Sequence, residues 1–236
     1  KARVCYINGE YEQATEYLIQ AEEALLKTKE YNIIALTYCL LSEIYIEQYR
    51  LNDAIALRNK SRHYYELCGN WKNIVYNHLR LSKVLMIEHP ADSVLCHLDS
   101  ARSIAQQLNN EELLFMVENY RASFYDYIKE YDLAKSTLYN AFKQYPAHTP
   151  NADDYFLMSR IYYNIGQLDS ALYILDNYYE PLCQTHSNRE TLSLFRSEIY
   201  KSRQDLSNAL KYLDEEKWYY DEETDKPIGT IIIPSF

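Results

Sequence analysis

The chain has 236 residues, with 24 Lys and Arg against 34 Asp and Glu, which gives a formal net charge of −10. A surface of this sign repels a phosphate backbone, so we expect no direct nucleic-acid binding by this region. The chain contains only 4 Gly and 6 Pro, and this composition favours helices over a turn-rich β architecture. No apolar run approaches the roughly 20 residues that a helix needs to cross a bilayer.

A helix-sized unit recurs six times along the chain, and each copy carries a small apolar residue at the same place, which we call the anchor. Successive anchors stand 37 to 40 residues apart. A fixed period in this range is typical of a solenoid, in which stacked units bury a continuous core. The anchors are Ala14, Ala54, Val94, Ala134, Ala171 and Ala209.

Each unit is expected to begin with a helix that packs closely against its partner. A small residue stands twelve positions before every anchor, and a mostly larger residue follows three positions later on the same helical face. In the first unit, residues 1–8 supply only the back half of this helix, so the first hairpin is incomplete and its missing piece is expected upstream. The small residues are Ala2, Ser42, Ser82, Ala122, Ser159 and Ser197.

A second helix is expected to follow in each unit. Apolar residues recur at the anchor and four and seven positions later, as at Ala134, Leu138 and Ala141, which is one stripe of an amphipathic helix. Two positions before the anchors stand mostly polar side chains that accept hydrogen bonds, and we expect them to be N-caps. The expected caps are Glu12, Asn52, Asp92, Asp132, Asp169 and Ser207.

The end of the chain changes character. The last helix is expected to run through residues 210–223, and residues 223–236 form an extended apolar tail or linker, because Pro227, Gly229 and Pro234 exclude a helix around an isoleucine triplet. We expect residues 228–236 to dock on an apolar surface, either of their own chain or of a neighbouring copy.

These columns together resemble the tetratricopeptide repeat (TPR) in a long-period variety. The stretch YFLMSRIYYNIGQLDSALYIL, residues 155–175, is the closest match, and the pattern is weakest where Arg58 replaces an apolar residue and Val94 replaces Ala. The resemblance implies an all-α fold, a right-handed α-α superhelix of about six helical hairpins. We expect this solenoid to span residues 1–222.

In this family the first helix of each unit lines the concave side of the superhelix, so the resemblance implies a partner site on those helices. Aromatic, amide and isolated basic side chains in such positions suit an extended peptide. Pairs one turn apart on these helices, such as Asn119 with Ser123, do not supply the Lys and Asn with which chaperone-binding members hold a C-terminal carboxylate. The candidate partner-binding residues are Tyr76, Lys83, Asn119, Asp126, Tyr127, Phe156, Arg160 and Tyr163.

Signatures of catalysis are missing from the sequence. It contains no Gly-rich phosphate loop, no HExxH and no G-x-S-x-G, so we expect no enzyme and no cofactor. The six histidines are scattered singly and the five cysteines show no CxxC spacing, so neither a metal site nor a disulfide framework is expected.

The sequence therefore favours a protein- or peptide-binding module of a larger scaffold or regulator. The alternative is a ligand- or peptide-sensing domain of a signalling or transcriptional regulator whose output domain lies outside these residues. The chain opens at Lys1 and has no initiator Met, so we expect an excerpt of a longer protein or a processed product. The default compartment is the cytoplasm, and the alternative is an extracytoplasmic domain of a membrane-anchored regulator.

Overall fold

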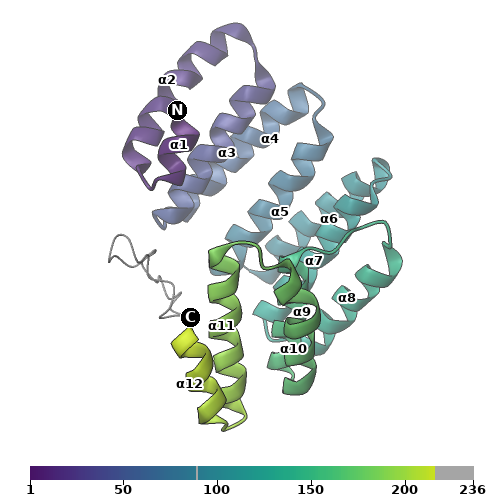
Figure 1. The fold of residues 1–236 in the computed structure, drawn as a ribbon. Coiled ribbons are helices and arrows are strands. Elements are labelled where there is room, and N and C mark those ends of the chain that lie inside the picture. Colours follow the sequence, from purple (N-terminus) through teal and green to yellow (C-terminus); the bar gives the residue numbers. More distant parts are fainter. Residues whose placement is uncertain (89, 216–236) are drawn as a thin grey trace. The chain divides into compact units, whose positions relative to one another are not determined.

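The structure is a computed structural model that describes residues 1–88 and 90–215. Within these residues it is built from helices and contains no strand, which confirms the predicted all-α class (Figure 1). No described helix is both long and apolar enough to cross a membrane. The helices are α1 (Ala2–Ile7), α2 (Tyr11–Thr28), α3 (Tyr31–Glu47), α4 (Leu51–Leu67), α5 (Trp71–Glu88), α6 (Ala91–Gln107), α7 (Glu111–Tyr127), α8 (Tyr131–Gln144), α9 (Ala152–Asn164), α10 (Leu168–Ile174), α11 (His186–Ser202) and α12 (Leu206–Glu215).

The described helices pair into six consecutive hairpins, each made of an odd-numbered helix and the even-numbered helix that follows it. In the first hairpin, α1 has only 6 residues, as expected of an incomplete unit. The chain divides into two compact units, Lys1–His148 and Thr149–Phe236. The continuity of the predicted solenoid over residues 1–222 stays a prediction, and the tail lies outside the described residues.

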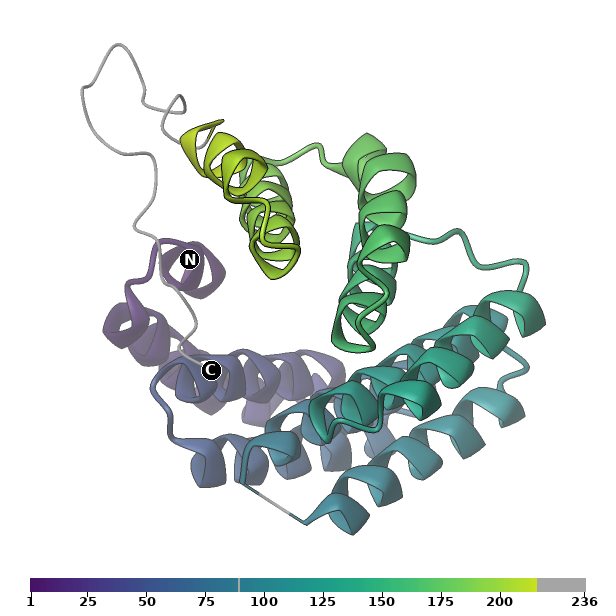
Figure 2. The same ribbon diagram turned by 90° about the horizontal axis from the view of Figure 1, so that it is seen from below.

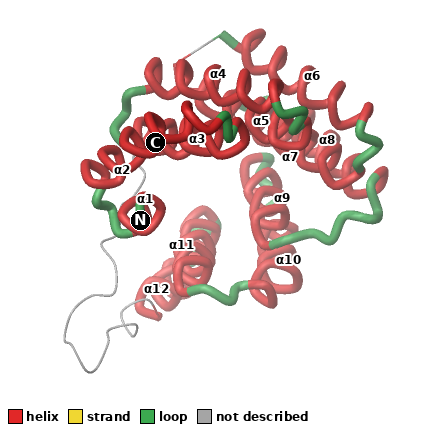
Figure 3. The backbone as a smooth tube through the Cα atoms, turned by 90° about the horizontal axis from the view of Figure 1, so that it is seen from above, coloured by secondary structure: helices red, strands yellow, loops and turns green. Residues whose placement is uncertain are grey.

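The first unit arranges its helices in two layers. Figure 3 shows α3 and α5 on one side of this unit and α4 and α6 on the other, and Figure 2 shows the same hairpins stacked side by side from a second direction. The odd-numbered helix α5 also contacts α7 directly. We call the side formed by α1, α3, α5 and α7 the odd-helix face.

The second unit contains the hairpins α9–α10 and α11–α12. After α10 the chain continues as a π-helix, Leu175–Tyr179, and a 3-10 turn, Glu180–Leu182. Leu172, Leu175 and Tyr179 pack with Leu192 and Ile199 of α11 in one buried cluster. The wider π turn is therefore part of the core of this unit.

The anchor prediction is confirmed, because all six anchor residues are buried. In two units the hydroxyl of the small-residue column reaches the anchor directly. Ser42 Oγ donates to the carbonyl oxygen of Ala54 at 3.1 Å, and Ser159 Oγ donates to that of Ala171 at 2.9 Å. The two helices of these hairpins thus meet at the predicted point, where only a small side chain leaves room for the contact.

The cap prediction is wrong by two residues. The second helices begin earlier than expected, so Glu12 and Asp92 lie inside the first turns of α2 and α6. The residues at those N-caps are Glu10 and Pro90, and neither makes a side-chain cap hydrogen bond. A carboxylate in the first turn instead interacts favourably with the positive end of the helix dipole, which accounts for the acidic column.

Candidate functional site

One buried residue breaks the repeat. The residue four positions after the anchor is buried in the first five hairpins, and in the hairpin α3–α4 it is Arg58, with only 4 % of the residue exposed. A guanidinium removed from water has to be paired and hydrogen-bonded there, since an uncompensated buried charge is strongly unfavourable. The other five residues of this column are Leu18, Leu98, Leu138, Leu175 and Leu213.

The Arg58 guanidinium is fully engaged with α3. Its Nε donates to Ser42 Oγ at 3.1 Å, its Nη1 donates to Cys39 Sγ at 3.3 Å, and its Nη2 forms an ion pair with Glu43. The side-chain amide of Asn77 on α5 donates to the backbone carbonyl of Arg58 at 3.1 Å. Arg58 therefore joins α3, α4 and α5 through polar contacts at a place where the other hairpins use leucine.

Through Glu43 the buried arginine is connected to the odd-helix face. The Glu43 side chain is 25 % exposed, and its Oε1 also lies 3.9 Å from Nε of Arg80 on α5, whose side chain is 48 % exposed. Lys83, one turn further along α5, is exposed. Because Glu43 is already paired with Arg58, its charge only partly neutralises Arg80. We call Glu43, Arg58, Arg80 and Lys83 the Arg58 cluster.

The pKa of Tyr6 on α1 is influenced by burial and by the charges of Glu43 and Arg80. Burial, followed by the negative charges of Glu43 and Glu47, raises the pKa of the Tyr6 hydroxyl, and Arg80 acts in the opposite direction. The Tyr6 ring also packs against Tyr11 with centroids 6.0 Å apart. Side chains from α1, α3, α4 and α5 thus surround one polar region of the first unit.

The candidate residues of the first unit differ in how much surface they present. Tyr76 is partly buried against the hydrophobic core, while Tyr127 is exposed at the end of α7. Asn119 is partly buried, and Asp126 is buried, so its carboxylate presents little surface to a partner. Of this set, Lys83 and Tyr127 are the most accessible.

Two of the three candidate residues of the second unit lie in an aromatic cluster. Phe195 of α11 contacts Phe156 and Tyr163 of α9 edge-on, with ring centroids 5.2 and 5.4 Å apart. The Tyr163 hydroxyl lies 3.0 Å from Ser202 Oγ and donates to a carboxylate oxygen of Glu198 at 3.4 Å. Arg160 is half-buried on α9. Phe156 and Tyr163 therefore help to join α9 to α11 in addition to any contact with a partner.

Sequence reasoning missed Arg58 and Arg80 as functional candidates. Arg58 was recognisable as the one charged residue in a leucine column, but the repeat pattern alone does not show that its side chain reaches α3. Arg80 carries no signal in the sequence, because its position relative to Glu43 depends on how α3 and α5 pack.

A histidine pair joins α5 to α6. Nδ1 of His78 lies 2.9 Å from Nδ1 of His97. Burial, the neighbouring His97 and the positive charge of Arg62 lower the pKa of His78 to about 4. Burial and Arg62 lower the pKa of His97 as well. The same positive charge opposes a bound metal cation, and the described residues contain no group of three or more metal-ligating side chains.

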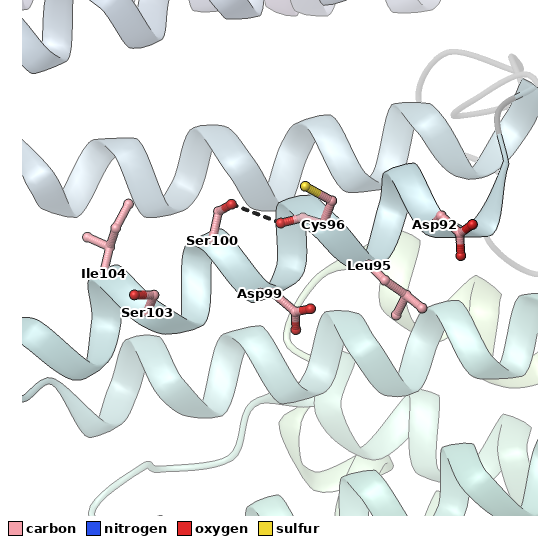
Figure 4. A pocket seen from close by; sticks show the side chains of 7 residues that line it. All are labelled: Asp92, Leu95, Cys96, Asp99, Ser100, Ser103 and Ile104. Carbon is pink, nitrogen blue, oxygen red and sulfur yellow. Dashed lines mark hydrogen bonds between the residues drawn. The ribbon is translucent and has the colours of Figure 1, made fainter.

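Two surface hollows are lined by residues other than the candidate residues. One runs along α6 and is lined by Leu95, Cys96 and Ile104 among others, with Ser100 Oγ donating to the Cys96 carbonyl oxygen (Figure 4). The other lies beside Gly166 and Asp169, where Asp169 forms an ion pair with Arg203.

Neither a protein family nor a curated protein matches the sequence, but solved structures match its fold. The Rap protein complexed with Competence and Sporulation Factor is 16 % identical over 92 % of this chain and 62 % of its own, with a TM-score of 0.71. NprR in complex with its cognate peptide NprX is 15 % identical over 94 % of this chain and 65 % of its own, with a TM-score of 0.67. The signal-transduction ATPase of Pyrococcus horikoshii with a tetratricopeptide repeat sensor is 14 % identical over 92 % of this chain and 35 % of its own, with a TM-score of 0.68.

This chain spans less than two thirds of each of these proteins. At such low identity the likeness establishes the fold alone. The helical hairpins, the buried anchors and the matching structures agree, and the chain is a helical-repeat protein with the TPR-like fold.

Proposed function

We propose that this chain is an interaction module that binds an extended protein or peptide segment on its odd-helix face. The observation that carries the proposal is the Arg58 cluster. At this place a buried arginine stands where the repeat otherwise has leucine, and its ion pair with Glu43 connects it to the odd-helix face. Repeated residues are accounted for by packing, so recognition is expected where the repeat is broken.

Two further observations support this function. The similar structures of Rap and NprR are both described as complexes, one with Competence and Sporulation Factor and one with the peptide NprX. Exposed Lys83 and Tyr127 in the first unit supply a cation and an amphipathic ring, which suit polar and apolar side chains of a peptide. Phe156, Arg160 and Tyr163 of α9 are proposed as a separate set of partner-contacting residues within the second unit.

The test is binding of a fluorescein-labelled positional-scanning hexapeptide library to the full chain, followed by fluorescence anisotropy. We expect one or more sub-libraries to bind, and the double variant Arg80→Ser with Lys83→Ser to weaken that binding at least tenfold. The matched control is Lys27→Ser with Lys143→Ser, which removes two exposed cations from the even-numbered helices α2 and α8. Equal loss of affinity in both double variants would show that net charge alone causes the effect. Undiminished binding by the variant of Arg80 and Lys83 would show that the peptide binds elsewhere.

A sensing role is the second candidate. It is favoured by the similarity to a repeat region that is itself described as a sensor within a larger signal-transduction ATPase. In that case peptide or ligand binding would be reported to an output domain outside these residues. Sequencing the flanking coding region decides between the two, because a helix-turn-helix or a membrane-spanning segment beside these residues supports the sensor.

A further inference from the structure

The last described helix carries an exposed apolar stripe. Leu206, Leu210 and Leu213 of α12 are 65 %, 60 % and 40 % exposed. They stand at spacings of four and three residues, so they share one face of the helix. We call these three residues the α12 stripe.

The same positions are covered in the preceding hairpin, α9–α10. The three residues that correspond to the stripe in α10 and the turn after it are Leu168, Leu172 and Leu175, counted from the anchor of that unit. All three pack in the hydrophobic cluster that includes Leu192 and Ile199 of α11. In that hairpin the face is therefore covered by a cluster to which α11, the next odd-numbered helix, contributes Leu192 and Ile199.

The spacing of the repeat indicates which residues reach this face after α12. The helices α3, α5, α7, α9 and α11 begin 15 to 18 residues after the preceding anchor. The same interval after Ala209 ends at residues 224–227, and the sequence continues as PIGTIIIPSF over residues 227–236. This stretch is apolar, and its two prolines and one glycine oppose a helix.

The connecting segment is long enough for a return along α12. Residues 216–226 can span up to about 36 Å when extended, whereas the 10 residues of α12 measure about 15 Å. An isoleucine-rich segment bound on three leucines removes apolar surface of both from water, which is the main driving force for such an association.

We propose that residues 227–236 bind the α12 stripe of their own chain and take the place of the odd-numbered helix that covers this face in the preceding unit. The tail would then complete the core of the second unit with an extended segment. This inference is independent of the peptide-binding function, because it concerns α12 and not the odd-helix face of the first unit.

The test is hydrogen–deuterium exchange of the full chain, read by mass spectrometry on peptides from residues 228–236. We expect the wild-type amides to exchange at least tenfold more slowly than an unstructured peptide of the same sequence. The variant Leu206→Asp with Leu210→Asp is expected to return them to the unstructured rate. Both side chains are mostly exposed, so the change leaves the described packing intact. The control is Leu133→Asp with Tyr139→Asp, two exposed apolar positions of α8, and it should keep the slow exchange.

A second variant tests the contact from the other side. Replacing Ile231 and Ile232 by Ser should raise the exchange rate of the tail while the circular dichroism of the chain is unchanged. Exchange at the unstructured rate in the wild type overturns the proposal. So does slow exchange that persists in the α12 variant, because the tail then binds elsewhere. Protection that grows with protein concentration together with a dimer mass would assign the stripe to a second copy, and it also contradicts the proposal.

Discussion

Arg58 and Leu138 occupy the same position of the repeat, but their replacement should change stability in opposite directions. Leu138 is fully buried, so Leu138→Ala removes apolar contacts and leaves a cavity, with an expected loss of about 3 kcal/mol in the free energy of unfolding. Arg58→Leu restores the residue that the repeat uses elsewhere. Replacing a buried ion pair by an apolar side chain is often neutral or stabilising by about 1–4 kcal/mol.

The structure indicates the lower part of that range for Arg58→Leu. Glu43 is partly exposed and keeps Arg80 nearby, so it is not left as an isolated buried charge. Ser42 keeps its hydrogen bond to the Ala54 carbonyl oxygen. Ser42 Oγ, Cys39 Sγ and the Glu43 carboxylate each lose one donor, and all three belong to α3. We therefore expect a change between about 0 and +2 kcal/mol in the free energy of unfolding.

Urea unfolding followed by circular dichroism, together with the fluorescence of Trp71 in a Trp218→Phe background, measures both variants. With a slope of about 2 kcal/mol per molar urea, Leu138→Ala lowers the midpoint by about 1.5 M. Repeat arrays can unfold in stages, so the comparison is made on the transition reported by Trp71, which lies in the same unit. A midpoint for Arg58→Leu lowered as far as that of Leu138→Ala would refute the argument that this arginine is retained for a reason other than stability.

Three further predictions concern single positions. Ala134→Leu should lower the free energy of unfolding by about 1–3 kcal/mol in the same urea assay, since the anchor has no room for a larger side chain, and an unchanged midpoint would contradict close packing there. Tyr49→Gly should raise it by about 0.5–1 kcal/mol, because Tyr49 is 90 % exposed and adopts the left-handed conformation with φ of 57°; a loss would mean that the ring makes a contact that matters. His78 has a folded-state pKa of about 4 against an ordinary value near 6.5, so the unfolded chain binds more protons between these pH values. Stability therefore falls as the pH is lowered through that window, by about 3 kcal/mol in total. Urea midpoints at pH 7 and pH 4.5 should show a smaller difference for His78→Leu than for the wild type, and equal differences would remove the histidine from the explanation.

The fold was predictable to the extent that it repeats. Six anchors and six small residues, each in register, predicted helical hairpins, and the contact between Ser42 and Ala54 confirms where the two helices meet. The start of the second helices was not predictable from the acidic column. A carboxylate favours both the N-cap and the first turn, so Asp92 fits either position until the backbone is known.

The candidate site was predictable only in part. The resemblance placed Lys83 and Tyr127 on accessible helix positions, and both are exposed. The same reasoning offered Asp126 as a surface residue, but it is buried. Which side of a helix is covered depends on the helices that pack against it, and the packing of the hairpins determines which helices those are.

The sequence by itself determined the class of this protein. A period of 37 to 40 residues with fixed small and apolar columns permits only stacked helical hairpins, since each unit buries its apolar face against the next. The tertiary structure decided what the non-repeating residues do. It showed that Arg58 extends from the core to Cys39 and Glu43 and that the leucines of α12 are exposed where the preceding unit covers them. Both facts depend on how separate helices pack against one another, and the residue pattern within a single helix does not encode that packing.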